Sequence, residues 1–489
     1  MHAAGPVVLA VGAVAGARLG EHLGATPALA ALAVAVVAAV GSLLFGRGPA
    51  RLAIGTVAVV LLATALMQRA LDGQEHSPLA APTRARASAT ITATLAGDPD
   101  GAQYNADALV RVDRIDGRSA GHRTALVTAG GDAAERLRLL ESGDEIEASG
   151  WFQPLSGYDR RFRWRHAVAS FDAVELLSFV PARSPLDRTA NALRSRVLAG
   201  GRHLQATERA LVAGFLLGDT RALGRDVEEQ FRASGLTHLL AVSGANVAFV
   251  LALTRPLVRR LGLRAQLVAG LAVLVLFGTM TRWEPSVLRA CAMAACSMAA
   301  LYLGRPTAGV RVLALAVVAL VLADPFLIHS IGFLLSCGAS AGIAFLAAPI
   351  TARLRGPHWL REPLSVTLAA QIGVAPVLIP VFGSVPLAAL PANLVAAPIV
   401  GPLTVLGLVS GIAGGAVESW APGVAAMLQA PTGLLARAML QIAEVFSRMP
   451  IDIDGRAATA LLAGTALLGA VRLWSGRRHN LRVDALSSR

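Results

Sequence analysis

Three polar side chains interrupt the apolar stretch FRASGLTHLLAVSGANVAFV at residues 231–250. His238, Ser243 and Asn246 supply hydrogen-bond donors and acceptors, and a serine beside a histidine can form a nucleophile and its base. Ser243 and His238 are five residues apart, so on one helix they lie on different faces and cannot form this pair by themselves. His329 would have to supply the base from another segment. An intramembrane serine protease is therefore the weakest of the interpretations.

Polar groups at membrane depth are costly, and they normally face a cavity, a partner helix or a substrate path. Ser243 and the glycines Gly235 and Gly244 permit close approach of backbones, so each polar residue could simply pack and hydrogen-bond between helices. Three such residues within nine positions, beside a segment too short to cross a bilayer, favour a lined cavity instead.

Further polar side chains stand in or beside apolar segments. Arg289 lies one turn into the segment that opens at Pro285, where an arginine must face water, a phosphate or a carboxylate such as Glu284 or Asp324. Asp324 precedes a proline and could instead cap a helix. We predict that one hydrated path is lined or shaped by the following residues: Asp219, His238, Ser243, Gly244, Asn246, Arg289, Ser336 and Gln371.

Arginines alternate with aromatic rings in YDRRFRWRHA, residues 158–167. Such a pattern can hold a polyanion by charge and stack bases on its rings. The alternative is a solvated basic loop whose rings pack on the neighbouring β domain. The predicted nucleic-acid-binding set comprises Arg160, Arg161, Arg163, Trp164 and Arg165.

The elements that carry these residues belong to a membrane protein. The 489 residues are 55% hydrophobic and only 15% charged, with a mean hydropathy of +0.59, which is far from a soluble globular balance. Apolar runs near the ~20 residues that cross a bilayer recur, and we predict about eleven or twelve spans. Examples are residues 28–45, 52–67, 265–281, 287–303, 312–323, 328–349 and 457–474. Prolines divide residues 383–420, which are either one broken span or a re-entrant pair.

The net charge of +13 comes from arginine, since the chain contains no lysine. The arginines cluster in alternate loops, near residues 47–51, 255–264, 305–311, 353–361 and 472–482. The positive-inside rule makes these loops cytoplasmic. It therefore predicts a multi-pass protein of the cytoplasmic membrane, with residues 70–180 outside and the C-terminus inside.

Residues 70–180 alternate apolar and polar side chains at period two, with Gly, Asp and Pro between the runs. We predict a small extracytoplasmic OB-like β-barrel, although this periodicity also allows a small sandwich. Next, Leu186, Ala190, Leu193 and Val197 share one helical face with arginines on the other, which predicts a helix in the membrane interface. The apolar run at 210–217 is too short to cross and is predicted to be re-entrant.

Several motifs together resemble the ComEC-type competence proteins, inner-membrane channels that import transforming DNA. The motifs are GFLLGDTRAL, FRASGLTHLLAVSGANV, EPSVLRACAM, DPFLIHSIGFLLSCGASAGI, AAQIGVAPVLIP and PLAALPANLVAAPIVGP, in the order that family shows. The β domain also resembles the family's N-terminal OB-like domain, especially in GDEIEASGWFQPLSGYDRRFRWRH. Many relatives carry histidine where this chain has Asn246, so a titrating group is not expected there.

The resemblance implies a channel for single-stranded DNA, driven by a separate cytoplasmic helicase-like motor and supplied by an extracytoplasmic DNA receptor. Many relatives continue into a metallo-β-lactamase-like nuclease domain with an HxHxDH motif, which is absent here. We therefore expect no enzyme activity, no metal site and no cofactor, and a separate nuclease for the second strand. A P-loop is excluded because it needs lysine. The oligomeric state is left open.

A secondary transporter of a small solute is the main alternative, because its site would also lie on broken helices near the midplane. It does not account for an extracytoplasmic barrel beside a re-entrant segment, and no inverted repeat is visible. The predicted organisation is N-terminal spans at 1–69, the OB-like domain at 70–180, interfacial and re-entrant helices at 181–235, the channel domain at 236–475 and a basic cytoplasmic tail at 476–489.

Overall fold

The computed structural model describes residues 4–23, 32, 34–35, 49–101, 104–305, 307–386, 388–449 and 452–454. The predicted spans at 28–45 and 457–474 and the predicted basic tail lie almost entirely outside these residues. The chain forms two compact units, and α13, α15 and α16 each run from one unit into the other. The first unit holds residues 1–225, 238–337 and 398–440, and the second holds the rest.

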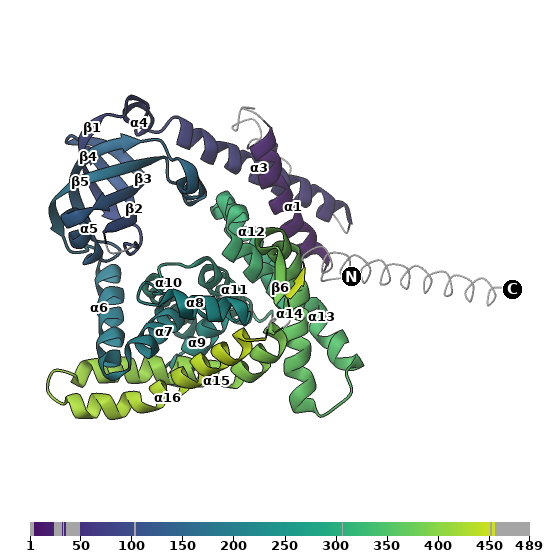
Figure 1. The fold of residues 1–489 in the computed structure, drawn as a ribbon. Helices are drawn as coiled ribbons and strands as arrows, with labels where there is room; N and C mark the ends of the chain where they lie inside the picture. Colours follow the sequence, from purple (N-terminus) through teal and green to yellow (C-terminus); the bar gives the residue numbers. More distant parts are fainter. Residues whose placement is uncertain are drawn as a thin grey trace. The chain divides into compact units, whose positions relative to one another are not determined.

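The helices are shown in Figure 1. Those wholly in the first unit are α1 (Ala4–His22), α3 (Pro49–Glu75), α4 (Ala80–Ala85), α5 (Gly131–Arg138), α6 (Pro185–Gly200), α7 (Ala206–Leu217), α9 (Gly244–Val258), α10 (Leu263–Met280), α11 (Pro285–Tyr302) and α12 (Gly309–Ala323). The others are α8 (Arg225–Ala233), α13 (Ile331–Arg353), α14 (His358–Phe382), α15 (Ala389–Val417) and α16 (Pro422–Ser447). Short 3-10 helices are η1 (Gly157–Arg165), η2 (Gly201–His203), η3 (Thr237–Leu239) and η4 (Pro325–His329). Two short strands, β6 (Ser384–Pro386) and β7 (Asp452–Asp454), pair in the second unit.

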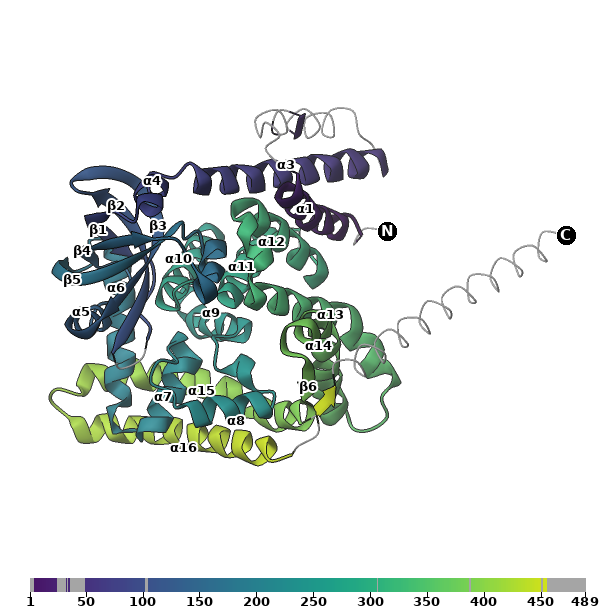
Figure 2. The same cartoon turned by 45° about the horizontal axis from the view of Figure 1, so that its top comes forward.

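Seven helices among the described residues are long and apolar enough to cross a bilayer, and α12 is a shorter apolar helix. The chain is therefore a polytopic helical membrane protein, as predicted. Small residues allow its helices to pack closely. α1 lies against α3 (Figure 2), and Thr64 Oγ1 donates to the carbonyl of Gly16 at 2.8 Å.

The structure defines two segments whose path through the bilayer was ambiguous in the sequence, one because of its prolines and the other because of its short apolar run. α15 is one continuous 29-residue helix although Pro398 and Pro402 lie inside it, so 389–417 is a single candidate span. α7 has 12 residues and is about 18 Å long, too short to cross. It is buried from Ala210 to Leu217 and ends at Gly218, whose φ of +74° is the left-handed conformation that glycine adopts without strain.

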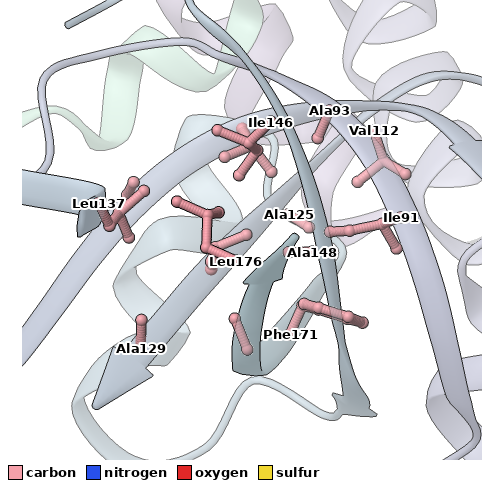
Figure 3. Packing of buried hydrophobic residues seen from close by; sticks show 14 of the residues in the cluster. Ile91, Ala93, Val112, Ala125, Ala129, Leu137, Ile146, Ala148, Phe171 and Leu176 are labelled. Carbon is pink, nitrogen blue, oxygen red and sulfur yellow. The ribbon is translucent and has the colours of Figure 1, made fainter. Parts of the chain in front are cut away.

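The β domain is a closed five-stranded barrel and not a sandwich. Its strands are β1 (Ser88–Leu95), β2 (Asn105–Ile115), β3 (Arg118–Gly130), β4 (Glu145–Gln153) and β5 (Ala169–Val180), in the order β1-β2-β3-β5-β4 with β1 pairing β4. Only β3 and β5 run parallel. Alternate side chains fill the core, including Ile91, Ile146 and Phe171 (Figure 3). Gly150 is required where β4 meets β5, because a methyl group there would overlap the carbonyl of Asp172.

Candidate functional site

The polar stretch at 231–250 is a broken helix. Residues 237–239 form η3, residues 240–243 are not helical, and α9 starts only at Gly244, with Ser243 extended as its N-cap. The first N–H groups of a helix lack intrahelical partners and carry a partial positive charge. This break therefore places an electropositive helix end within a candidate span, Thr237–Val258.

Asn246 connects three helices from the first turn of α9. Its side chain is 1% exposed, and its Nδ2 donates to the carbonyl of Phe215 on α7 at 2.9 Å. Its Oδ1 accepts from Ser243 Oγ and from Thr404 Oγ1 on α15, each at 3.2 Å. The Asn246 amide is therefore occupied by hydrogen bonds within the protein. Asn246 and Ser243 shape the break and leave few donors free for a ligand. Thr404 was not among the predicted residues.

Three predicted residues meet beside this break. Arg289 on α11 is 8% exposed, and its Nε donates to Ser336 Oγ on α13 at 2.7 Å. A methyl group on Gly244 would lie 2.8 Å from Arg289 Nη2, so a larger residue there would displace the guanidinium from its present position. Its other contact is Met293 Sδ, 2.8 Å from Nη1.

Within the described part of the chain, no carboxylate lies at ion-pair distance from Arg289. The two acids that could have held it are engaged elsewhere or lie apart. Asp324 caps η4 by accepting from the Phe326 N–H at 3.0 Å, and it lies 3.2 Å from His166 Nε2. Glu284 is the N-cap residue of α11, and burial raises the pKa of its carboxyl although the charge of Arg165 opposes this shift. Arg289 is therefore a buried cation without a counter-ion among these residues.

Asp219 lies in a second cluster, where the barrel meets the helices. Arg194 on α6 is 2% exposed at its side chain, and its Nη2 lies 2.6 Å from Asp98 Oδ2, between β1 and β2, and 3.6 Å from Asp219. Arg282 Nη2 lies 2.6 Å from the other oxygen of Asp98. Arg221 binds Asp219 through Nε at 2.8 Å and Nη2 at 2.6 Å. We call these five residues the junction cluster.

The junction cluster also closes helix ends. Arg194 Nη1 donates to the carbonyl of Leu217 at 3.1 Å and to that of Met280 at 2.6 Å, at the ends of α7 and α10. Burial alone would raise the pKa of Asp98, but the charges of Arg194 and Arg282 outweigh burial and lower it. Burial likewise acts to raise the pKa of Asp219, and the bonds from Arg221 bring it below its usual value. Both acids therefore stay ionised at neutral pH.

The prediction that α6 turns its arginines away from its buried face is wrong for Arg194. Ala190, Arg194 and Val197 share the buried face, whereas Leu186 is exposed. The cause is that this face meets carbonyl oxygens and carboxylates, which need a donor. Neither Arg194, Asp98 nor Arg282 was predicted as a site residue.

The arginine-rich segment of the barrel forms η1, whose residues are all at least partly exposed. The Trp164 ring stacks on His329 with 3.6 Å between centroids and meets Phe326 edge-on at 5.6 Å. Its face is thus covered by η4 and not by the barrel. Tyr158, absent from the predicted set, is 79% exposed and lies 3.2 Å beneath the Arg161 guanidinium. Arg161 covers one face of this ring, and Tyr158 is nevertheless the most exposed aromatic residue of the segment.

The remaining predicted residues are His238 and Gln371. His238 is exposed in η3, and Gln371 is half-buried on α14, in the second unit. His329 stacks on Trp164 and lies 3.3 Å from Glu21, so it is not bonded to Ser243 as a protease base would be. The described residues contain no group of three or more His, Cys, Asp or Glu placed to hold a metal ion.

Comparison with known proteins identifies relatives. A model of the competence protein family matches residues 215–478. The chain is similar to the uncharacterised protein YcaI of Escherichia coli K12, at 27% identity over 236 residues, which cover 44% of this chain and 30% of that protein. It is also similar to ComE operon protein 3 of Bacillus subtilis 168, at 26% identity over 190 residues, 38% of this chain and 24% of that one. The matched part is less than a third of either relative's length, and no solved structure matches.

Proposed function

The chain belongs to the competence protein family, and we infer from this that it forms the cytoplasmic-membrane channel through which single-stranded DNA enters during transformation. The observation that carries the proposal is the buried guanidinium of Arg289, which has no carboxylate partner among the described residues. An arginine inside a span is kept there at a cost, which is offset when it meets an anion or water during function.

The surroundings of Arg289 suit a phosphodiester. A DNA strand carries one negative charge per nucleotide and cannot enter hydrocarbon, so its path needs donors or cations. The N-terminal end of α9 begins at Gly244, directly beside the Arg289 guanidinium. The partial positive charge of that helix end and the full charge of Arg289 favour a phosphate at the same place. We propose that this place is the narrow part of the DNA path.

The barrel supplies the entrance in this proposal. Its five mixed strands support the OB-like assignment, a fold that binds single strands by charge and stacking. Arg160 and Arg161 are exposed in η1 beside the exposed ring of Tyr158. The arginine distribution supports an extracytoplasmic barrel and a cytoplasmic C-terminus. A motor, a DNA receptor and a separate nuclease remain proposed partners, and we propose no catalytic activity for this chain.

Binding of a labelled single-stranded oligonucleotide to the full chain in detergent tests the entrance. We expect affinity to fall with salt, and the double substitution Arg160→Gln, Arg161→Gln to make the salt dependence less steep by about 1.4 in log–log slope, since each lost phosphate contact removes about 0.7. Tyr158→Ala should weaken binding by about 1–3 kcal/mol if a base stacks there.

The matched control removes the same charge from the end of the β2–β3 hairpin, where Arg114 on β2 and Arg118 on β3 are also exposed. Arg114→Gln, Arg118→Gln should leave both affinity and salt slope unchanged. Affinity that is insensitive to salt, or equal losses in the two double variants, would favour a transporter of small solutes over a DNA channel.

A further inference from the structure

A cavity of about 460 Å³ lies where the end of α3 meets the barrel and the end of α12. Residues of α3, of β3 and around η4 line it. Its apolar wall includes Leu66, Ala70 and Leu322, and its polar wall includes Arg69, Arg123 and His166. An amphipathic cavity of this kind accepts a ligand with a charged group and an apolar part.

The level at which the cavity lies in the bilayer follows from the length of α3. Arg51 and Arg69 bracket the apolar part of that helix and are 18 residues apart, which is about 27 Å along the axis. The hydrocarbon core of a bilayer is ~30 Å thick. With Arg51 at one boundary, Arg69 lies at the level of the lipid headgroups on the other. The cavity therefore opens where phosphates of the bilayer are most concentrated.

Two positive charges in this cavity are not neutralised by the protein. His166 lies 3.2 Å from Asp324, and His122 is hydrogen-bonded to Asp113, so the histidines already have acidic partners. Among the residues that the structure describes, the side chains of Arg69 and Arg123 make neither an ion pair nor a hydrogen bond. They come from a membrane helix and from the barrel, and they share one cavity.

The Arg123 guanidinium reaches across to α3. A methyl group on Gly73 would lie 3.5 Å from Arg123 Nη1, so this arginine approaches the helix that carries Arg69. The barrel is held to the same stretch of helix by Gln74, whose Nε2 donates to the carbonyl of Arg163 at 2.8 Å and whose Oε1 accepts from Arg163 Nε at 3.3 Å. The two guanidinium groups of Arg69 and Arg123, which could together hold one phosphate, therefore lie beside an existing contact between the barrel and α3.

We propose that this cavity binds the phosphodiester headgroup of an anionic phospholipid in the leaflet on the barrel's side. The two arginines would hold the phosphate, and the apolar wall formed by Leu66, Ala70 and Leu322 would face the start of the acyl chains. The apolar wall at headgroup depth favours a lipid over a DNA strand, because a DNA strand has no acyl chains to place against that wall. A zwitterionic lipid is disfavoured because its ammonium would approach unpaired guanidinium groups. The bound lipid fixes the barrel to the bilayer, independently of whether the chain conducts DNA.

Native mass spectrometry of the full chain in a neutral detergent tests this site, with phosphatidylglycerol and phosphatidylcholine as probes. We expect phosphatidylglycerol to bind and phosphatidylcholine not to compete. Arg69→Gln, Arg123→Gln should weaken phosphatidylglycerol binding by roughly tenfold or more, because each basic residue near the surface adds to the attraction. Arg114→Gln, Arg118→Gln is the matched control and should bind as the unaltered chain does. Arg69→Lys, Arg123→Lys keeps both charges and should retain most of the binding, which separates charge from misfolding.

Other outcomes overturn the proposal. Equal phosphatidylglycerol binding by both Gln double variants would mean that the lipid binds elsewhere. Displacement by millimolar inorganic phosphate would identify a free-anion site. If the Arg69 and Arg123 substitutions removed oligonucleotide binding and left phosphatidylglycerol binding intact, the cavity would be a DNA contact. Loss of oligonucleotide binding through the η1 arginines alone would leave the lipid site unaffected, so the two proposals fail separately.

Discussion

Arg289→Gln is expected to reduce the uptake of transforming DNA by about 100-fold or more while the amount of protein in the membrane stays unchanged. The guanidinium is buried and bonded only to Ser336 and Met293, so its removal leaves no carboxylate unpaired among the described residues. The substitution therefore removes a contact to a passing phosphate and does not destabilise the fold. Uptake of labelled DNA and the level of tagged protein in membranes are measured on the same cells.

Arg264→Gln serves as the control for this substitution. Arg264 is an exposed arginine at the start of α10, and its Nε donates to the Tyr302 hydroxyl at 3.2 Å. Arg264→Gln should lower DNA uptake by less than about twofold, since exposed polar contacts contribute little to stability. If Arg289→Gln instead lowers the amount of protein in the membrane, Arg289 pairs with a structural counter-ion. That result would contradict a role for Arg289 in the DNA path. Normal uptake with a normal protein level would contradict the proposal equally.

Arg194→Met is expected to destabilise the first unit by about 3–5 kcal/mol, the cost of breaking a buried ion pair from one side. Arg194 joins Asp98 of the barrel to the ends of α7 and α10, and its side chain is 2% exposed. Methionine keeps most of the volume but leaves two carbonyl oxygens without their donor and Asp219 with less positive charge. Thermal unfolding of the purified chain in detergent measures the loss, and membrane abundance should fall with it.

Arg183→Met provides the comparison, because Arg183 is also paired with a barrel carboxylate, Glu145, at 2.8 Å. The Arg183 side chain is 77% exposed, so its removal should cost less than about 1 kcal/mol. Equal destabilisation by the two substitutions would show that the junction cluster is no more than a surface ion pair. It would then not hold the barrel to the helices.

Much of the architecture could be predicted from local patterns. The period-two alternation in residues 88–180 is produced by a barrel with one buried face, and the apolar runs correspond to helices because both signals depend on near neighbours only. The prolines in α15 were ambiguous for the same reason. A membrane helix tolerates Pro398 and Pro402 when neighbouring helices satisfy the freed backbone groups, and the sequence does not show those neighbours.

The site was predictable in composition but not in its contacts. Arg289 was found because an arginine in an apolar run stands out, whereas its bond to Ser336 joins residues 47 positions apart. Arg194 was assigned to the wrong face because helical periodicity places a charge in water unless a distant partner is known. The covered ring of Trp164 depends on η4, a segment of the helical part more than 150 residues further along the chain.

The most direct test of the central claim, that this chain conducts DNA across the cytoplasmic membrane, is the fate of labelled DNA in a transformable strain with and without the gene. Surface-bound and cytoplasmic label are counted separately in the same cells. We expect the strain without the gene to bind DNA at its surface as before and to contain no cytoplasmic label, with uptake restored by the unaltered chain and not by Arg289→Gln. Cytoplasmic label at an undiminished level in the absence of the gene would contradict the account.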